Sequence, residues 1–416
     1  MSKTKPFIIP KELVVEAYKL VKGNAGAAGV DQQSLAGFEI NLKNNLYKLW
    51  NRLSSGSYFP PPVKAVPIPK KQGGERILGV PTVSDRIGQM VIKLMFEPTV
   101  EPYFYPDSYG YRPNKSALDA VGVTRQRCWK YNWCLEFDIK GLFDNIDHEL
   151  LMKAVRKHTD NKWVILYIER WLKAPMQLLD GSLIERTKGT PQGGVVSPVL
   201  SNLFLHYVFD AWMAKHHPAA PWCRYADDGL VHCQTEQEAQ KILAELKDRF
   251  ENCNLELHPT KTKIVYCKDG SREGQYPQIE FTFLGYTFRR RVVRNSKLNS
   301  YFVSFTPAAS KEALKSMRAE TRKRGFRNRS DLELKEIATI YNPVLRGWIN
   351  YYGRYCPSSL NSVLGHFNET LIAWAMHKYK KLKGHKTRAD IFVRGIVKRE
   401  PNLFVHWNKG WIRTFA

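Results

Sequence analysis

The chain has 416 residues, of which 43% are hydrophobic, so its length and composition exclude a largely disordered protein and allow roughly two or three domains. Its net charge of +25 is too one-sided to serve solubility alone and indicates a polyanionic partner, most simply nucleic acid. Residues 289–416 carry 27 basic and 8 acidic residues. We therefore expect the last third of the chain to bind long RNA or DNA.

The seven cysteines are scattered, and none forms a C-x-x-C pair. This pattern predicts no zinc site and is typical of a reducing cytoplasm. The chain shows no signal-peptide pattern at its start and no apolar run approaching a membrane span. We expect a soluble, cytoplasmic protein that does not contact a membrane.

The hydrophobic spacing predicts a mixture of helices and strands. Residues 58–69 hold five prolines and must be extended. They lead into a basic hairpin turn at 70–76. We expect helices over 11–22, 42–53, 85–96, 149–171, 198–214 and 235–253, strand structure over 279–290, and a helical, basic region after about residue 306. The run around 289–300 reads as a hinge between two bodies.

The segment Tyr225-Ala226-Asp227-Asp228 predicts a strand, a tight turn and a second strand, because apolar residues flank it on both sides. A turn brings the two carboxylates together. They then repel each other and raise each other's pKa unless a cation neutralises them. Aspartate is also common in ordinary polar turns, so this pair alone favours a simple hairpin turn.

A third acid changes that interpretation. Leu135, Phe137 and Ile139 alternate in a strand-like run, which places Asp138 on the opposite face near the end of the strand. A strand-borne aspartate and a hairpin-borne pair can hold two metal ions about 3.5–4 Å apart. This arrangement serves in-line nucleotidyl transfer, and Mg²⁺ suits carboxylate and phosphate oxygens.

In order along the chain, these segments resemble bacterial group II intron reverse transcriptase/maturases, and the resemblance covers nearly the whole chain. The segments that carry it are Gly29-Val30-Asp31, Ile77 to Thr82, Ser108 to Pro113, Asp138 to Asp144, Gly189 to Pro198, Tyr225 to Asp228, Phe283 to Tyr286 and Pro343 to Tyr352.

The resemblance implies an α+β fold of the right-hand polymerase type, in which fingers and a palm with an antiparallel sheet precede a helical thumb. It divides the chain into an N-terminal extension with fingers (1–130), a palm with interleaved finger segments (131–290) and a helical thumb, or maturase domain X, with a basic C-terminal segment (291–416).

The resemblance also implies the catalytic roles. Asp138, Asp227 and Asp228 would hold two Mg²⁺ ions, and the backbone carbonyl of Ile139 would add a ligand. Phe143 stands where the family has an aromatic steric gate that favours deoxynucleotides. Composition alone favours packing in the core, and only the spacing from Asp138 argues for the gate.

Further residues would bind the nucleotide and the nucleic acid. Lys70 and Arg76 would hold the triphosphate, unless they only form a solvated turn, and Gln192 would contact the nucleotide. Lys261 would protonate the leaving pyrophosphate, with Lys263 an equal candidate on local sequence. Nucleic-acid contacts are expected at Arg112, Gly193, Arg322, Lys323 and Arg324, and Trp348, Tyr351 and Tyr352 either stack on bases or pack in the core.

The implied function is an RNA-directed DNA polymerase that copies RNA into cDNA and, as an intron-encoded maturase, binds group II intron RNA to promote splicing and retrohoming. Its partners would be intron RNA, an RNA template with a DNA primer, deoxynucleoside triphosphates and target DNA. The chain carries neither the paired cysteines nor the H-N-H arrangement of the endonuclease domain that many relatives add. Insertion into existing single-stranded or replication-fork DNA is then the simpler expectation.

Two alternatives remain open at this stage. A domesticated relative would keep the polymerase activity but serve host defence or repair, and intron sequences flanking the reading frame would argue against it. A splicing-only maturase would bind RNA with an inactive palm, but this chain keeps all three acids.

Overall fold

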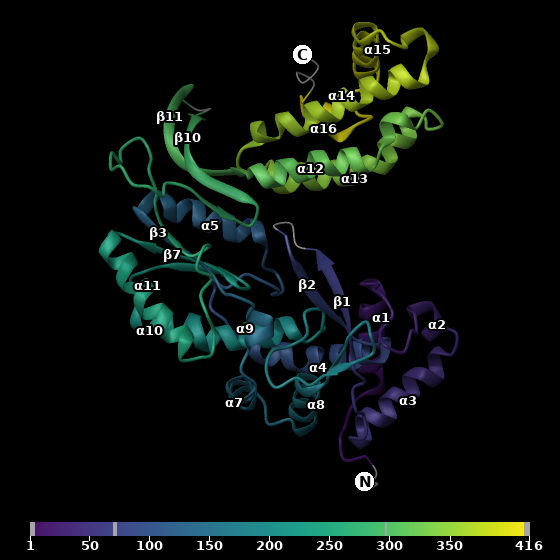
Figure 1. The fold of residues 1–416 in the computed structure, drawn as a ribbon, viewed down its shortest axis with the longest axis vertical. Helices are drawn as coiled ribbons and strands as arrows, with labels where there is room; N and C mark the ends of the chain where they lie inside the picture. Colours follow the sequence, from purple (N-terminus) through teal and green to yellow (C-terminus); the bar gives the residue numbers. More distant parts are fainter. Residues whose placement is uncertain (1–4, 70–72, 296–297, 412–416) are drawn as a thin grey trace. The chain divides into compact units, whose positions relative to one another are not determined.

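The computed structural model describes residues 5–69, 73–295 and 298–411. The chain folds into two compact units, Met1–Ser116 with Leu135–Lys263, and Ala117–Cys134 with Ile264–Ala416. Figure 1 labels most of the α-helices and several strands of both units. One compact unit can hold more than one functional part, so the three-part division expected from the sequence stays a prediction.

The first unit consists mainly of helices, one four-stranded sheet and most of a second four-stranded sheet. Its helices are α1 (Lys11–Gly23), α2 (Leu35–Glu39), α3 (Leu42–Ser55), α4 (Val83–Val100), η1 (Glu101–Tyr103), α6 (Leu142–Asn145), α7 (His148–His158), α8 (Lys162–Lys173), α9 (Ser197–Leu205), the π-helical η2 (His206–Asp210), α10 (Ala211–His216) and α11 (Glu236–Glu251).

One sheet has the order β2-β1-β4-β5 and the other the order β6-β7-β3-β8. In the first, β1 pairs antiparallel with β2 and parallel with β4. The division into units passes through β3 and β8. The strands are β1 (Val63–Pro69), β2 (Glu75–Val80), β3 (Trp133–Asp138), β4 (Met176–Gln177), β5 (Leu183–Ile184), β6 (Trp222–Tyr225), β7 (Asp228–Cys233) and β8 (Lys263–Tyr266).

The second unit joins a three-stranded antiparallel sheet, β11-β10-β9, to a helical region. Its elements are α5 (Ala117–Lys130), β9 (Phe281–Phe283), β10 (Tyr286–Asn295), β11 (Ser300–Ala309), α12 (Lys311–Lys323), η3 (Phe326–Asn328), α13 (Leu334–Tyr352), η4 (Pro357–Leu360), α14 (Asn361–Lys378), η5 (Lys380–Leu382), α15 (Lys386–Arg399) and α16 (Val405–Asn408).

These elements confirm the predicted α+β class with a C-terminal helical region. The helix expected over 149–171 is two helices, because α7 ends at His158 and the Asn161 side chain caps α8. The Asp147 side chain caps the start of α7, since its carboxylate accepts the Leu150 amide at 2.8 Å. The hinge expected around 289–300 was wrong. Strands β10 and β11 pair there from Tyr286↔Ala309 to Asn295↔Ser300.

The helical region of the second unit has its own hydrophobic core. The rings of Phe326, Tyr341 and Phe367 lie 4.8–5.4 Å apart between centroids. Tyr351 donates its hydroxyl to the Leu284 carbonyl, and Trp348 and Tyr352 pack against the core. These contacts favour the packing interpretation of the three C-terminal aromatics over base stacking. In the part of the chain that the structure describes, no helix is both long and apolar enough for a membrane span.

Helix α4 buries polar side chains that tie distant segments to the first unit. Arg86 donates to the carbonyls of Ala25 and Ala27, each at 3.0 Å, and so holds the glycine-rich N-terminal loop. Gln89 accepts the Val195 amide at 2.7 Å. One helix thus positions two loops that are far apart in sequence, and buried polar groups of this kind are costly unless every partner is in place.

Asp85 is the buried acid of α4. Its Oδ1 accepts hydrogen bonds from the Tyr58 hydroxyl at 2.6 Å and from the Trp171 indole at 3.0 Å. Burial raises the pKa of the Asp85 carboxyl from 3.8 to about 6, although these two hydrogen bonds oppose the rise. The folded protein therefore holds a proton at Asp85 in a pH range where the unfolded chain has lost it.

This pKa shift predicts a pH-dependent effect of Asp85→Asn. Because the raised pKa makes wild-type stability fall as pH rises from about 4 to 6, the free energy of unfolding of the variant should gain about 2–3 kcal/mol on wild type between pH 4 and pH 7. The asparagine carbonyl can still accept both hydrogen bonds. Urea unfolding at a series of pH values measures the difference, and a difference that stays constant with pH would contradict the assignment.

Candidate active site

The predicted strand-turn-strand at Tyr225 to Asp228 is confirmed. Strands β6 and β7 pair antiparallel with Tyr225 opposite Asp228, so Ala226 and Asp227 alone form the turn. Ala226 has φ +56°, in the left-handed region that glycine or asparagine usually occupies. Strained backbone of this kind is found preferentially at functional sites. The tight turn places two successive, partly buried carboxylates at one end of a sheet.

Asp138 is the last residue of β3, which is the neighbour of β7 in the sheet. Its side chain is 15% exposed, and its charge acts on both Asp227 and Asp228. Lys261 donates to Asp138 Oδ2 at 2.8 Å. The sheet thus brings the three predicted acids into one electrostatically coupled group, with an ammonium beside the first of them.

Burial and like charges shift the pKa of these groups. The pKa of Asp228 is raised to about 7. Burial is the largest cause, and the charges of Asp227 and Asp138 add to it. Burial likewise raises the pKa of Asp227. Burial lowers the pKa of Lys261, but its hydrogen bond to Asp138 and the charges of the three acids outweigh that effect and raise it. Three ionised carboxylates are therefore unfavourable at this site unless a positive charge lies beside them.

The donor chemistry of the three acids fits Mg²⁺, which prefers carboxylate oxygens. A divalent cation would remove the repulsion that raises the pKa of Asp228. Within residues 5–69, 73–295 and 298–411, however, no three histidine, cysteine, aspartate or glutamate side chains converge tightly enough for a complete metal-binding set. Mutual repulsion and the Lys261 contact both act against such convergence. The three acids therefore fit Mg²⁺ by the type of their donor atoms and by their negative charge.

Ile139, the proposed backbone ligand, is buried and forms an isolated bridge with Leu257. The flanking hydrogen bonds run from the His258 amide to the Asp138 carbonyl and from the Lys140 amide to the Glu256 carbonyl. Neither bond uses the carbonyl of Ile139. The geometry is compatible with the expected role of that carbonyl.

A fully buried arginine lies behind the Asp-Asp turn, and our sequence reasoning missed it. Arg224 forms a two-pronged ion pair with Asp210, at 2.7 and 2.6 Å. It also donates to the Asn202 side chain at 3.1 Å, to the Ala226 carbonyl at 3.2 Å and to the Ser108 hydroxyl at 2.9 Å. The carbonyl contact ties the turn to a rigid polar cluster, and its partners are too far apart in sequence to be read as a pattern.

The backbone of Gly110 packs directly against the same turn. A Cβ atom at Gly110 would lie 2.4 Å from the Ala226 nitrogen, and the Gly110 carbonyl accepts the Asn202 amide at 2.6 Å. The neighbouring segment pairs with β6 through Ser108 and Arg224. Only glycine allows this close approach, which gives the Ser108 to Pro113 motif a physical role in supporting the turn.

Tyr111 is a second residue that the sequence reasoning missed. It has φ +59° and is half exposed, and its ring meets Phe143 edge-on at 6.4 Å. Burial and the charge of Asp227 raise the pKa of Tyr111, while Arg76 lowers it. Tyr111 thus lies near two predicted nucleotide-binding residues, Arg76 and Phe143, and near the predicted catalytic acid Asp227. The position of Tyr111 inside a family motif was the available signal.

The glycine-rich loop before α9 packs against β2. The Gln192 carbonyl accepts the Gly79 amide at 2.8 Å, and its side-chain amide donates to Asp144 at 3.2 Å. Gly193 has φ +123°, and a Cβ there would lie 2.6 Å from the Gly79 carbonyl oxygen. These contacts hold Gln192 and Gly193 close to the β1-β2 hairpin of the same unit.

Other predicted residues are placed differently. Lys70 lies outside the described residues. The Arg112 side chain is 6% exposed and donates to Glu101 at 2.7 Å and to the carbonyls of Tyr105 and Ser108. These partners explain Arg112 by local structure, and its expected contact with nucleic acid stays a prediction. Lys263 forms an ion pair with Glu136 at 3.3 Å, so Lys261 is the lysine in contact with Asp138.

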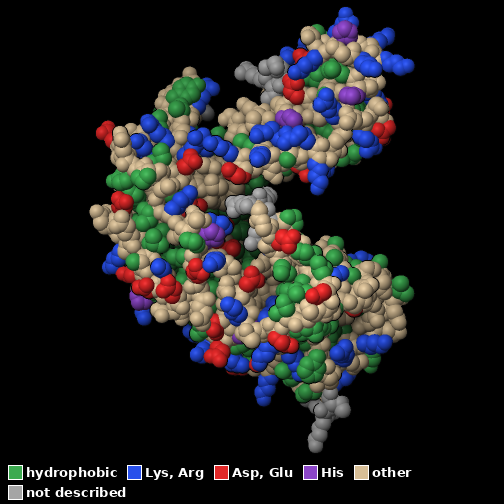
Figure 2. All heavy atoms as spheres, viewed as in Figure 1, with side chains coloured by type: hydrophobic (Ala, Val, Ile, Leu, Met, Phe, Trp, Pro, Cys, Tyr) green, Lys and Arg blue, Asp and Glu red, His purple; other side chains and the backbone are tan. Residues whose placement is uncertain are grey.

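Arg322, Lys323 and Arg324 are exposed at the end of α12. Arg324 also donates to Glu320 at 2.7 Å. Lysine and arginine side chains are spread over the visible face of the helical region of the second unit (Figure 2). Such a surface suits phosphate contacts, which do not depend on nucleotide sequence.

Comparison with known proteins gives two family matches. The family described as reverse transcriptase (RNA-dependent DNA polymerase) matches residues 68–288, and the group II intron, maturase-specific domain matches residues 314–391. Protein YkfC of Escherichia coli K12 is 30% identical over 336 residues, covering 70% of this chain and 84% of the relative. The group II intron-encoded protein LtrA of Lactococcus lactis subsp. cremoris is 26% identical over 431 residues, covering 83% and 69%.

Among solved structures, a telomerase from Candida albicans in complex with a fragment of telomeric RNA is similar with a TM-score of 0.46 and 12% identity. The match covers 92% of this chain and 69% of the telomerase chain.

The buried Arg224–Asp210 pair predicts a large loss of stability on Asp210→Asn. Removing one partner leaves a buried charge without compensation, which should lower the free energy of unfolding by about 3 kcal/mol. Thermal or urea unfolding measures the loss. The matched control is Asp331→Asn, whose ion pair with Arg329 is exposed and which should change stability far less because solvent screens it. Equal losses in the two variants would contradict the prediction.

Proposed function

Because the chain belongs to the family of group II intron reverse transcriptases and maturases and is an RNA-directed DNA polymerase, we propose that it copies an RNA template by extending a DNA primer with deoxynucleoside triphosphates at Asp138, Asp227 and Asp228. The observation that carries this proposal is the electrostatic coupling of these acids at the end of one sheet. Reverse transcriptases generally use divalent metals, and two Mg²⁺ ions are proposed here.

The three carboxylates and the Ile139 carbonyl would hold the metal ions. When bound, Mg²⁺ would activate the primer 3′-hydroxyl and stabilise charge on the leaving pyrophosphate. The protein's own contribution is to hold its carboxylates in place. The Arg224 cluster and Gly110 fix the turn from behind, so that the acids do not have to be reorganised for each nucleotide.

Lys261 has two possible duties at this site, and its environment supports one of them more strongly. Its raised pKa keeps the ammonium protonated at neutral pH, and the ammonium donates to Asp138 Oδ2 at 2.8 Å. Protonation of pyrophosphate would require the ammonium to leave Asp138 first. We therefore propose that Lys261 acts mainly as a fixed positive charge and as a proton donor only after that move.

Selection and binding of the nucleotide are proposed for neighbouring residues of the first unit. Lys70 and Arg76 would hold the triphosphate, and Gln192 with Gly193 would contact the nucleotide and template. The half-buried ring of Phe143, supported edge-on by Tyr111, would lie beneath the sugar and leave no room for a 2′-hydroxyl.

The second unit is proposed to bind group II intron RNA and to promote splicing and retrohoming into target DNA. Support comes from the match to the maturase-specific domain and from the exposed basic surface of α12 to α15. The splicing-only alternative predicts an inactive palm, whereas this chain keeps Asp138, Asp227 and Asp228 in one coupled group. The charge at Arg322, Lys323 and Arg324 would supply contacts with RNA phosphates.

Asp227→Ala tests the proposed chemistry. Removing one preorganised charged group should reduce primer extension on an RNA template by at least about 10²–10³-fold, while binding of intron RNA survives. Primer extension and filter binding are measured on the same preparations. Asp180→Ala, which removes an exposed carboxylate in the turn between β4 and β5, is the control and should extend primers normally. Equal loss of RNA binding in Asp227→Ala would show that the acid is structural.

Phe143→Ala tests the sugar gate. Without the ring, incorporation of ribonucleotides relative to deoxynucleotides should rise by about tenfold or more, because a steric clash has been removed. Single-nucleotide extension with matched deoxy- and ribonucleotides measures the ratio. Phe143→Tyr keeps the ring and should keep the wild-type ratio. An unchanged ratio in Phe143→Ala would remove the gate assignment and leave the ring as a packing residue.

A further inference from the structure

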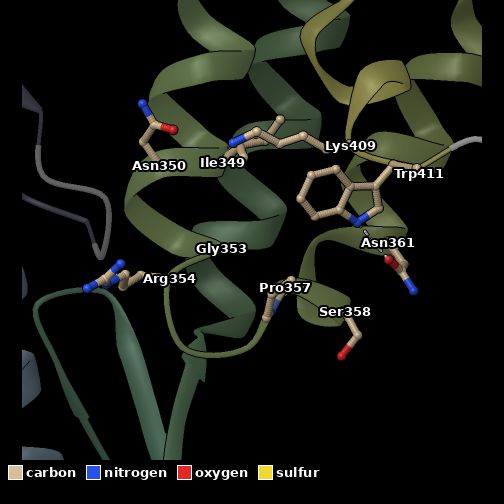
Figure 3. A pocket seen from close by; sticks show the side chains of 10 residues that line it. Ile349, Asn350, Gly353, Arg354, Pro357, Ser358, Asn361, Lys409 and Trp411 are labelled. Atoms are coloured by element: carbon tan, nitrogen blue, oxygen red, sulfur yellow. Dashed lines mark hydrogen bonds between the residues drawn. The ribbon is translucent and has the colours of Figure 1, made fainter. Parts of the chain in front are cut away.

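The second unit contains an open cavity of about 870 Å³ at the C-terminal end of α13. Its walls are the end of α13, the η4 turn and the segment at Lys409 to Trp411 (Figure 3). A second cavity of about 370 Å³ shares Ile349, Asn350 and Lys409 with the first and continues along α13 toward Arg346. Together they form one groove, which we call the α13 groove.

The lining of the α13 groove has the chemistry of an anion- and base-binding surface. Arg346 and Asn350 lie one turn apart on α13 and share a face, Arg354 lies just beyond the helix end, and Lys409 comes from the opposite wall. Among the described residues that line the two cavities, none is acidic. Three cations without a lining acid favour a phosphate-bearing ligand.

Trp411 supplies a fixed aromatic surface in the groove. Its indole Nε1 donates to Asn361 Oδ1 at 3.1 Å, and its backbone amide donates to the His406 carbonyl at 3.2 Å. In Figure 3 the indole and the Lys409 side chain both extend from the C-terminal segment toward α13. The half-buried ring is held by its indole hydrogen bond and by packing against the core of the helical region, so it loses little freedom when a base stacks on it.

We propose that the α13 groove binds an unpaired nucleotide of single-stranded RNA. Its base would stack on Trp411, its edge would reach the Asn350 amide, and the adjacent phosphates would contact Lys409, Arg354 and Arg346. The larger of the two cavities, about 870 Å³, is within the range of about 300–1,000 Å³ that small-molecule sites usually have. Neighbouring bases cover both faces of a base inside a duplex, whereas an unstacked base leaves a face open to an aromatic ring, so the groove selects unpaired RNA.

This inference rests on the proposed role of the second unit in RNA binding and adds a specific site to it. The wall formed by Lys409 and Trp411 lies beyond residues 314–391, the part that matches the maturase-specific domain. The exposed basic surface of α12 to α15 attracts any phosphate backbone, whereas the groove distinguishes single-stranded from paired RNA.

The test uses the full chain and two probes, a fluorescein-labelled 12-nucleotide single-stranded RNA and the same sequence as a duplex. Trp411→Ala should weaken binding of the single strand about tenfold, the effect of losing one stacked base, and change duplex binding less than about twofold. Trp411→Phe keeps a ring and should recover most of the affinity. Fluorescence anisotropy measures both.

The phosphate contact is tested by the salt dependence of single-strand binding. Lys409→Ala should reduce the slope of log K against log salt by about 0.7, the value for one phosphate contact on a single strand. Lys241→Ala is the control, because it removes an exposed lysine from α11, outside the proposed RNA-binding surface, and should leave the slope unchanged. Equal slopes for the two variants would overturn the assignment of Lys409.

A cross-linking experiment with the wild-type protein tests the groove without relying on variants, which could misfold. Single-stranded RNA carrying 4-thiouridine should cross-link to wild-type peptides containing Trp411 or Asn350, and cross-links confined to α12 or α15 would overturn the proposal. Primer extension by the same wild-type protein separates the two hypotheses. If wild type extends primers but Trp411→Ala binds the single strand like wild type, only the groove proposal fails.

Discussion

The first unit is constrained most by the placement of three carboxylates at one end of a sheet. Burial and like charge raise the pKa of Asp228 to about 7, so the fully ionised group is unfavourable by itself. Lys261 compensates one charge through Asp138. The remaining negative charge favours a cation at the site, and it also makes the site a liability for folding that the surrounding structure must offset.

That offset comes from buried polar contacts directly behind the site. The guanidinium of Arg224 donates to Asp210, Asn202, Ser108 and the carbonyl of Ala226. A neutral packing core would carry a smaller desolvation penalty, but it would not hold a backbone carbonyl in a left-handed turn. Helix α4 uses the same principle with Arg86 and Gln89 for two loops. Buried hydrogen bonds to main-chain groups fix positions where apolar packing would tolerate sliding.

The sequence predicted the parts of the site that depend on local pattern. Alternation along β3 placed Asp138, and apolar flanks placed the Asp227–Asp228 turn, because both features repeat with the period of a strand. It did not predict Arg224 or Tyr111, whose partners come from segments far apart in the chain. The wrong prediction of a hinge at 289–300 has a related cause. This basic run looks like a linker when read alone, but its backbone groups pair between β10 and β11.

The two units differ in the sign of the charge at their proposed nucleic-acid sites. The first gathers negative charge at the proposed catalytic site, which by itself would repel a polyanion. The second has an excess of positive charge, and this attraction to phosphate is strong but indifferent to base identity and pairing. Discrimination therefore has to come from short-range features with fixed geometry. The indole of Trp411, held by Asn361, is such a feature. A basic surface with one aromatic groove separates affinity from selectivity, so that each can change without the other.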